Sequence, residues 1–443
     1  MLKKFVTDDQ IQNVIDGLNK IYDQMKIKNK FSALEIKNFM ESYFEKSGYR
    51  EKNKSSKNNN ILVIHDSGIG DFITISAFLR ELRRIYPKSH IDLLVNKKAV
   101  PLAETCPYID NLIVIDLYLG KFDEFFEFYQ YVMDVVRDLL HRKIDIAFNL
   151  GQHPGSNLLA YMSGAKERIN NGAHSDHNEF INLGKIPFDY FSELMTTEID
   201  TTDLKNPHYS ELYICILKNY AKTRINNREL EIWFSPNDRF LAEINLQRFD
   251  NKKIYAISLG GGFKNKHWKA ENFAKLINMI LKNESATFAI FGGPSEIADA
   301  EIIKSIVDEQ FIIDFTGKFN YRQSMALLNL CDCYIGNDTG LMHAATALKI
   351  PVLTPNCFAN DIEMTPASSL QRYHPYKVPS VVVRPKHALP ECQNSPSSER
   401  IITGCTADES HCINQITPEK MFEGLQLLNK QIAKNAKEPL FLC

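Results

Sequence analysis

Short apolar runs alternate with amphipathic stretches through most of this chain, starting near residue 60. Apolar runs of about four to eight residues are typical of buried parallel strands, and apolar positions at i, i+3 and i+4 are typical of helices. The first half of the pattern predicts strands at 61–64, 91–95, 112–115 and 145–149, with an amphipathic helix over 72–86. Strands that alternate with helices predict a doubly wound α/β sheet.

The same alternation restarts near residue 253. The further predicted elements are strands at 253–259, 287–291, 311–314, 334–335 and 350–354 and helices at 270–281, 296–306, 322–330, 342–348 and from 418. Two such repeats predict two Rossmann-like domains, over 59–235 and 236–443, joined between about 226 and 251. We expect them to face a cleft at the carboxyl ends of their strands, where open α/β sheets bind ligands.

Residues 1–58 have a different pattern. Apolar positions recur at helical spacing between Ile11 and Ile21 and again between Leu34 and Tyr43. The polar, basic segment 47–60 shows no periodicity and is typical of a linker. We therefore predict an N-terminal helical extension that packs on the main body or forms an oligomer contact through residues 1–50. A role in recognising an acceptor is the alternative.

Composition narrows the class of protein. The net charge of −2 gives no reason to expect a nucleic-acid partner, and 44% hydrophobic residues suffice for two cores. No apolar run approaches the roughly 18 residues that span a bilayer, and the N-terminus lacks the apolar core of a signal peptide. We therefore expect a cytoplasmic protein whose nine cysteines are mostly reduced.

The segment YIGNDTGLMH, residues 334–343, is the strongest candidate for a binding turn. A buried strand breaks into a glycine-rich turn that opens a helix, which places backbone N–H groups where they attract phosphate. Asp338, Thr339 and Gly340 form the turn, and His343 faces the same side of the helix as Thr339. Helix capping is the alternative role for Asp338 and Thr339.

A second turn, SGIGD, follows the first predicted strand. Gly70 lets the chain approach a ligand closely. Asp71 begins a helix whose dipole favours the ionised carboxylate, so Asp71 is a candidate general base for a hydroxyl nucleophile. A simple helix cap is the alternative.

Two more glycine turns follow strands of the second domain. Gly260 and Gly261 precede a basic cluster that includes Lys266, and this combination suits a diphosphate. A solvated basic loop is the alternative. In the segment GGPSE, Glu296 opens a helix, where it either hydrogen-bonds ribose hydroxyls or stabilises the helix N-terminus.

Four segments together resemble one known family. They are ILVIHDSGIGDFITISAFLRELRRIYP (61–87), SLGGGFKNKHWKAENFAKLI (258–277), FGGPSE (291–296) and YIGNDTGLMHAATALKIPVL (334–353). Their order and spacing resemble glycosyltransferase family 9, which includes the ADP-heptose:lipopolysaccharide heptosyltransferases. The resemblance implies a GT-B fold, with an N-terminal acceptor domain and a C-terminal nucleotide-sugar donor domain. It also implies an inverting transfer that requires no metal.

The resemblance assigns roles to residues of this chain. Asp71 matches the catalytic aspartate, Lys266 the diphosphate-binding lysine and Glu296 the ribose-binding acid. The donor-binding turns are implied to include the following residues: Gly70, Gly260, Gly261, Asp338, Thr339, Gly340 and His343. The chain departs from the family at Leu341, where proline is common, and over 151–203, which has no clear match.

The implied reaction moves a sugar, most simply heptose from an ADP donor, to a hydroxyl of a lipopolysaccharide-core or other cell-surface glycan. The implied partners are a nucleoside-diphosphate sugar and a glycan or lipid-linked acceptor, met peripherally at the inner face of the cytoplasmic membrane. A sugar-nucleotide epimerase of the same architecture and a non-catalytic nucleotide-sugar-binding scaffold are the alternatives.

The C-terminal cysteines form a separate candidate site. Cys392, Cys405 and Cys412 lie in a loop before the last predicted helix. With His411, His387 or Cys357 as a fourth ligand, they could hold a structural Zn or Fe ion. The spacing lacks a Cys-x2-Cys pair, so free thiols are the first alternative and a disulfide is the second.

Overall fold

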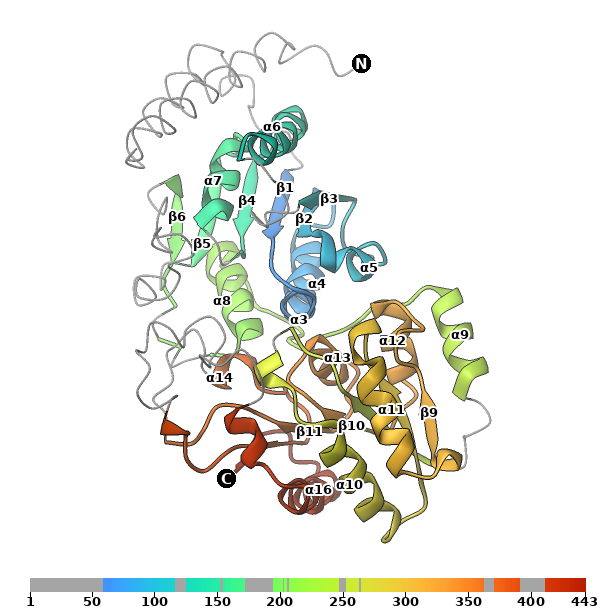
Figure 1. Ribbon diagram of the computed structural model, residues 1–443. Helices are drawn as coiled ribbons and strands as arrows, with labels where there is room; N and C mark the ends of the chain where they lie inside the picture. The colour runs from blue at the N-terminus through green and yellow to red at the C-terminus, as the bar shows by residue number, and fades with distance from the viewer. Residues whose placement is uncertain are drawn as a thin grey trace.

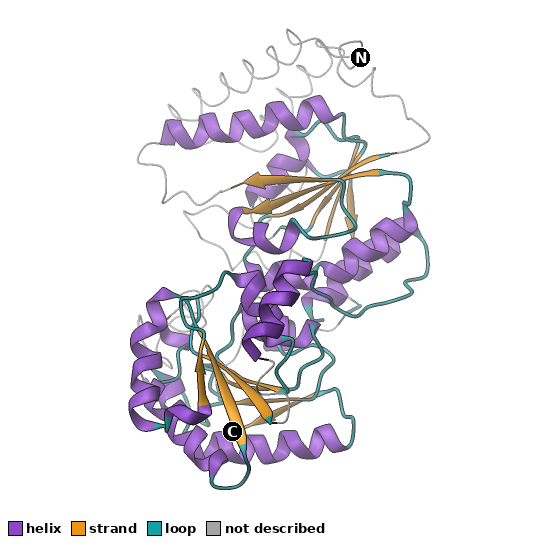
Figure 2. Ribbon diagram, turned by 90° about the vertical axis from the view of Figure 1, so that its right-hand side faces the viewer, coloured by secondary structure: helices purple, strands orange, loops and turns teal. Residues whose placement is uncertain are grey.

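The computed structural model describes residues 59–115, 125–151, 154–171, 194–201, 203–204, 207–246, 252–262, 264–361, 370–390 and 411–443. Figure 1 shows two α/β units, one above the other, and Figure 2 shows each sheet with helices on both faces. The predicted α/β class and the two doubly wound sheets are confirmed. The predicted helical extension, 1–58, lies outside the described residues.

The first unit is a six-stranded parallel sheet in the order β3-β2-β1-β4-β5-β6. Its strands are β1 Asn60–His65, β2 His90–Asn96, β3 Asn111–Ile115, β4 Ile146–Asn149, β5 Glu167–Asn171 and β6 Thr197–Ile199. Its helices are α3 Ile69–Thr74, α4 Ser76–Ile85, α5 Val100–Ala103, α6 Phe125–Arg142, α7 Pro154–Met162 and α8 Tyr209–Ala221. The register pairs Ile61 with Ile91 on one side and with Ile146 on the other.

The second unit repeats this plan with one more strand, in the order β13-β12-β11-β10-β7-β8-β9. Its strands are β7 Lys253–Ser258, β8 Ala286–Phe291, β9 Ile312–Asp314, β10 Cys333–Gly336, β11 Val352–Pro355, β12 Ser380–Val383 and β13 Pro439–Leu442. Its helices are α9 Pro236–Leu246, α10 Ala270–Leu281, α11 Ile297–Ile306, α12 Tyr321–Leu328, α13 Gly340–Ala347, α14 Leu370–Tyr373 and α16 Pro418–Ala433.

Short 3-10 turns begin or link several helices. They are η1 Lys97–Ala99, η6 Lys264–Lys266, η7 Pro294–Glu296, η8 Glu309–Phe311 and η9 Cys412–Gln415. The helix predicted over 72–86 is divided, because α3 ends at Thr74 and α4 begins at Ser76. The helix predicted from 296 begins instead at Ile297, after the η7 turn.

One apolar core joins the two units. Side chains of β1, α3 and α4 and side chains of α12 and α13 belong to the same cluster of buried residues. A second cluster fills the other face of the second sheet, between α10, α16 and the strands. Helix α3 packs against α13, and α5 packs against α12. The contact between the units is therefore an apolar interface. The expected domain boundary at 235/236 stays a prediction.

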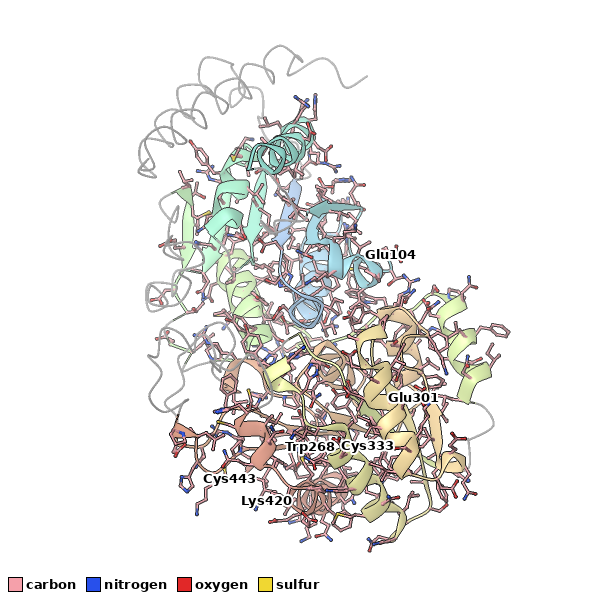
Figure 3. All side chains as sticks on the ribbon, viewed as in Figure 1. Glu104, Trp268, Glu301, Cys333, Lys420 and Cys443 are labelled. Atoms are coloured by element: carbon pink, nitrogen blue, oxygen red, sulfur yellow. The ribbon has the colours of Figure 1, made fainter. Side chains whose placement is uncertain are left out.

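Polar contacts flank this interface on two sides. Arg322 of α12 donates to Asp238 of α9 at 2.6 Å, to the carbonyl of Pro101 at 2.9 Å, and pairs with Glu104. Glu104, the C-cap of α5, lies at the side of the first unit that meets the second unit (Figure 3). On the other side, Glu211 of α8 accepts the hydroxyl of Tyr376 and pairs with Lys377 at 3.1 Å.

Within the described ranges, no helix combines the length and the apolar character needed to cross a bilayer.

Candidate functional site

Three candidate turns follow β1, β7 and β10, which lie at the points where strand order reverses in each sheet, and the fourth, with Glu296, follows the neighbouring strand β8. Open α/β sheets bind ligands outside the carboxyl ends of their strands at such points. The contact of α3 with α13 brings the turn after β1 against the turn after β10. The architecture therefore gathers turns that are far apart in the sequence.

Glycines allow this close approach. A Cβ atom on Gly70 would lie 2.7 Å from Cδ2 of His343 and 3.3 Å from Cα of Gly340. A Cβ atom on Gly340 would lie 3.4 Å from the backbone nitrogen of Gly70. Real Cβ atoms do not approach other atoms as closely as 2.7 Å, so a side chain at position 70 would force the His343 ring or the backbone at Gly340 to shift.

Asp71 caps its own helix. Its Oδ2 accepts the backbone N–H of Gly68 at 3.2 Å, and the side chain is half-buried. The capping alternative is therefore correct as a description of the contact. It also orients the carboxylate and, with the helix dipole, favours its ionised form.

Lys266 of η6 faces Asp338 of the turn before α13, with 3.2 Å between Nζ and Oδ2. Burial by itself would lower the pKa of Lys266. The negative charges of Asp338 and Asp71 oppose this effect, and the pKa is raised overall. Lys266 therefore stays cationic at neutral pH, and the charge of Asp71, in the other unit, helps to raise its pKa.

Asn337 holds the turns after β7 and β10 together, and it is not among the site residues predicted from the sequence. Its Oδ1 accepts the backbone N–H of Trp268 at 3.0 Å, and its Nδ2 donates to the carbonyl of Leu259 at 2.6 Å. Asn337 is fully buried, and Trp268 lies inside the second unit in Figure 3. An amide between a buried strand and a glycine turn is the signal that could have found it, because an amide side chain both donates and accepts.

Thr339 and His343 lie on α13 as predicted. The hydroxyl of Thr339 accepts the backbone N–H of Leu341 at 3.2 Å, so Thr339 is the N-cap of α13. His343 is buried, and burial lowers its pKa. The negative charge of Asp338 opposes this effect and the positive charge of Lys266 adds to it, and the pKa is lowered overall. The imidazole of His343 is therefore neutral at pH 7.

Glu296 lies against the glycine turn after β7. Its carboxylate accepts the backbone N–H of Gly293 at 2.7 Å and the hydroxyl of Ser295 at 2.6 Å. A Cβ atom on Gly260 would lie 3.1 Å from Oε2 of Glu296. The buried carboxylate thus stabilises a helix N-terminus, which is the alternative role predicted for Glu296. It lies beside the turn that we expect to hold the donor.

Gly261 packs on a histidine of the basic cluster. A Cβ atom on Gly261 would lie 2.9 Å from Nε2 of His267 and 3.7 Å from Cγ2 of Thr339. The turns after β7 and β10 are therefore neighbours. All the predicted donor-binding residues lie in adjoining turns, and their contacts to a ligand stay a prediction.

The cysteine site is only partly described, because Cys392 and Cys405 lie outside the described residues. Cys412 is buried, and its Sγ lies 3.3 Å from Nδ1 of His411. Cys357 belongs to a different apolar cluster from Cys412, and His387 pairs with Asp361 at 3.1 Å. Among the residues that the structure describes, no three His, Cys, Asp or Glu side chains are grouped to hold a metal.

The sequence is similar to known glycosyltransferases. Residues 211–375 match the model of glycosyltransferase family 9 (heptosyltransferase). A putative glycosyltransferase of Haemophilus influenzae is 22% identical over 66% of this chain and 81% of its own length. Lipooligosaccharide heptosyltransferase 2 of Haemophilus ducreyi is 22% identical over 66% and 80% of the two chains. Lipopolysaccharide heptosyltransferase 1 of Campylobacter coli is 24% identical over 66% and 82%.

Solved structures share the fold. A family 9 glycosyltransferase from Veillonella parvula superposes with a TM-score of 0.65 at 22% identity, over 85% of this chain and 99% of the other. The ADP-heptose LPS heptosyltransferase II of E. coli gives a TM-score of 0.58 at 19% identity, over 84% and 99%. The two-sheet architecture is therefore the one found in these enzymes.

Proposed function

We propose that this chain, a heptosyltransferase-like enzyme of glycosyltransferase family 9, transfers heptose from ADP-heptose to a hydroxyl of a lipopolysaccharide-core acceptor, with inversion. The family match and the heptosyltransferase relatives support the donor and the acceptor class. The observation that carries the proposal is the packing of α3 against α13. It puts the carboxylate of Asp71 within electrostatic reach of Lys266 in the other unit.

The diphosphate of the donor would bind at the turns after β7 and β10. Lys266 supplies a cation, and the N-terminus of α13 supplies backbone N–H groups and a favourable dipole. Asp338 holds the ammonium of Lys266 in place through their 3.2 Å contact. Glu296 lies beside Gly260, where the ribose hydroxyls of the nucleoside would meet it.

The transfer itself requires a base and a stabilised leaving group. Asp71 would take the proton of the acceptor hydroxyl as its oxygen forms a bond to the anomeric carbon. The bond between that carbon and the diphosphate oxygen breaks, and ADP leaves with the bonding electron pair. Lys266 and the backbone N–H groups at α13 would stabilise the developing charge. The attack comes from the face opposite the leaving group, which inverts the anomeric carbon.

The acceptor is proposed to be lipid-linked and to be met at the inner face of the cytoplasmic membrane. The names of the relatives, which are lipopolysaccharide and lipooligosaccharide heptosyltransferases, support this part of the proposal. Residues 1–50 are proposed to form an oligomer contact or to help bind the acceptor.

The decisive experiment incubates the protein with ADP-heptose and a heptose-deficient lipopolysaccharide core. Release of ADP together with an acceptor that gains one heptose in mass is the expected result. UDP-N-acetylglucosamine and ADP-glucose serve as control donors. Conversion of a nucleotide sugar to its epimer without acceptor would instead establish the epimerase alternative.

A structural metal at the C-terminal cysteines is a separate proposal, which the 3.3 Å contact between Cys412 and His411 supports. Because the loop lacks a tight cysteine pair, we expect less than one equivalent of zinc or iron in protein prepared without a chelator or a His-tag. Elemental analysis of the protein and of a Cys405→Ser variant tests this. A full equivalent that the variant loses would show that the site is a complete metal clip.

A further inference from the structure

A basic depression lies at the C-terminal end of α8. It has a volume of about 690 Å³, and its lining includes Lys218, Lys222, Arg224 and Arg228 but no carboxylate. The N-terminal end of the same helix, Tyr209, packs against Tyr373 near the candidate active site. Thirteen residues of helix separate the two ends by roughly 20 Å. The depression is therefore distinct from the donor turns.

The positive charge of this surface is largely uncompensated. Lys218, Lys222 and Arg224 are exposed, and within the described part of the chain none of them forms an ion pair. Arg228 pairs with Glu211, which also binds Lys377. The whole chain carries a net charge of −2, so positive charge is concentrated locally at this surface. A bound anion would relieve the repulsion among the cations.

Helix capping explains only part of the cluster. Lys218 stands in the last turn of α8 and Lys222 is its C-cap, where cations interact favourably with the helix dipole. Arg224 and Arg228 lie beyond the helix, so the dipole does not account for them.

Side chains of α4 hold the backbone of the loop that carries these arginines. Buried Glu81 of α4 accepts the backbone N–H groups of Asn226 at 3.0 Å and Asn227 at 3.3 Å. Arg84 donates to the carbonyl of Arg224 at 2.7 Å. These contacts use the backbone of the loop and leave the guanidinium of Arg224 exposed. The loop backbone is therefore held in position before any ligand arrives, which lowers the part of the entropic cost of binding that comes from ordering the backbone.

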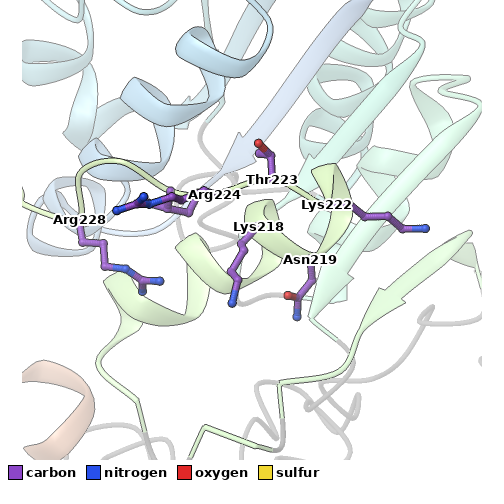
Figure 4. Close-up of a pocket in the computed structure, with 7 residues that line it drawn as sticks. Lys218, Asn219, Lys222, Thr223, Arg224 and Arg228 are labelled. Atoms are coloured by element: carbon purple, nitrogen blue, oxygen red, sulfur yellow. The ribbon is translucent and has the colours of Figure 1, made fainter.

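The donors of this surface match phosphate oxygens. The lining contains two guanidinium groups and two ammonium groups, together with the amide of Asn219 and the hydroxyl of Thr223. In Figure 4, Lys218, Asn219 and Arg228 extend to the same side of α8. Guanidinium groups bind phosphate through paired hydrogen bonds, and lysine adds a point charge. We propose that this depression is a second anion site, which binds the phosphate groups of a ligand other than the nucleotide sugar.

The test compares two matched double variants. Lys218→Gln with Lys222→Gln removes two cations of the site. Lys430→Gln with Lys434→Gln removes two exposed cations from the equivalent positions of α16, its last turn and its C-cap. A triple variant adds Arg224→Gln, which keeps the backbone carbonyl that Arg84 binds. Thermal melts check that each variant is folded.

Two probes distinguish the sources of phosphate. Inorganic pyrophosphate, titrated calorimetrically with saturating ADP present, represents a soluble phosphorylated compound. Flotation with phosphatidylglycerol vesicles, against phosphatidylcholine vesicles, represents a lipid headgroup. We expect the wild-type protein and the α16 variant to bind one or both anionic probes. The α8 double variant should bind about tenfold more weakly or worse, and the triple variant more weakly still.

Each result decides the proposal. Binding of pyrophosphate that the α8 changes remove supports a soluble phosphate ligand, and binding of anionic vesicles that they remove supports a headgroup. Equal binding by the two double variants, or no binding of either probe by the wild-type protein, would overturn it. ADP affinity is measured in parallel and should be unchanged in all variants. If the wild-type protein does not bind ADP, that result counts against the proposed function and not against the anion site.

Discussion

At Asp71, capping and general-base catalysis are compatible. The carboxylate accepts the N–H of Gly68 and is half-buried at the start of α3. A base must be oriented and ionised before it can remove a proton, and a helix N-terminus contributes to both. Thr339 and Glu296 show the same combination of a capping contact with a position beside the proposed donor site.

Asp71→Asn should lower turnover by roughly 10²–10⁴-fold, because the amide cannot accept the acceptor proton. The amide oxygen can still accept the N–H of Gly68, so the cap and ADP binding should be retained. Steady-state ADP release and calorimetry with ADP measure the two effects. Near wild-type turnover in a folded variant would leave Asp71 with its capping role alone.

Lys266→Ala should weaken ADP binding by roughly one to two factors of ten, the range expected for a charge-assisted hydrogen bond. The change also leaves the carboxylate of Asp338, beside the proposed diphosphate position, without its cation. Lys264→Ala, an exposed lysine of the same turn, is the matched control and should have little effect. Calorimetry that finds equal ADP affinity in the two variants would remove Lys266 from the site.

At the scale of elements, α3 and α13 touch through glycines. Gly70 faces His343, and Gly340 faces Gly70. The helices come from different units, so their spacing sets the separation of the proposed base, Asp71, from the proposed donor turns. Asn337 adds a second constraint, because its amide joins the turn after β10 to the turn after β7.

Gly70→Ala should reduce activity and stability together. The added Cβ would meet the His343 ring at 2.7 Å and the backbone at Gly340 at 3.3 Å. Overpacking of this kind costs typically about 1–3 kcal/mol. Gly262→Ala, where a Cβ meets nothing within 4 Å, is the control. Urea midpoints and ADP-release rates measure both effects, and equal behaviour of the two variants would show that the α3–α13 contact is not critical.

At the scale of the whole molecule, the interface between the units buries histidines. His208, at the N-cap of α8, stacks on Tyr376 at 4.6 Å and lies 5.2 Å from His374. Burial lowers the pKa of His208, of His374 and of His343. The neighbouring charges act in both directions, with Lys377 lowering the pKa of His208 and Glu438 raising that of His374.

Stability should therefore fall as pH falls below about 6.5, the ordinary pKa of histidine. The unfolded chain takes up protons there before the folded chain does, so the stabilisation is complete above that pH and is lost toward the lowered folded pKa values. The carboxylates with lowered pKa, such as Glu211, lose their contribution only near pH 4 and below. Urea midpoints at pH 7.5 and 5.5 measure the effect. His208→Asn, which keeps an N-cap acceptor, should show a smaller difference between the two pH values, and an unchanged difference would exclude His208 as a contributor.

The sequence by itself determined the local features of this protein. Apolar runs and helical spacing predict β1 to β4 and β7 to β11, because burial against a parallel sheet imposes those patterns. They also predict α3, α4, α10 to α13 and α16, whereas α5 to α9 and α14 were not predicted. The glycine turns and the capping residues can also be recognised, since their effects depend on neighbours within a few residues. Strands β5 and β6, with the sequences ERINN and TEI, were missed because polar residues interrupt them. Strands β12 and β13, with the sequences SVVV and PLFL, were missed as well.

Only the tertiary structure decided which of these local features meet. Lys266 and Asp338 are 72 residues apart in the chain, and the contact of Gly70 with Gly340 spans both units. Such contacts depend on how the strands are ordered and how the two cores pack together, and periodicity within one element carries no information about either. The basic depression also depends on tertiary contacts, because Arg84 and Glu81 of α4 hold the backbone of the loop that carries the exposed Arg224.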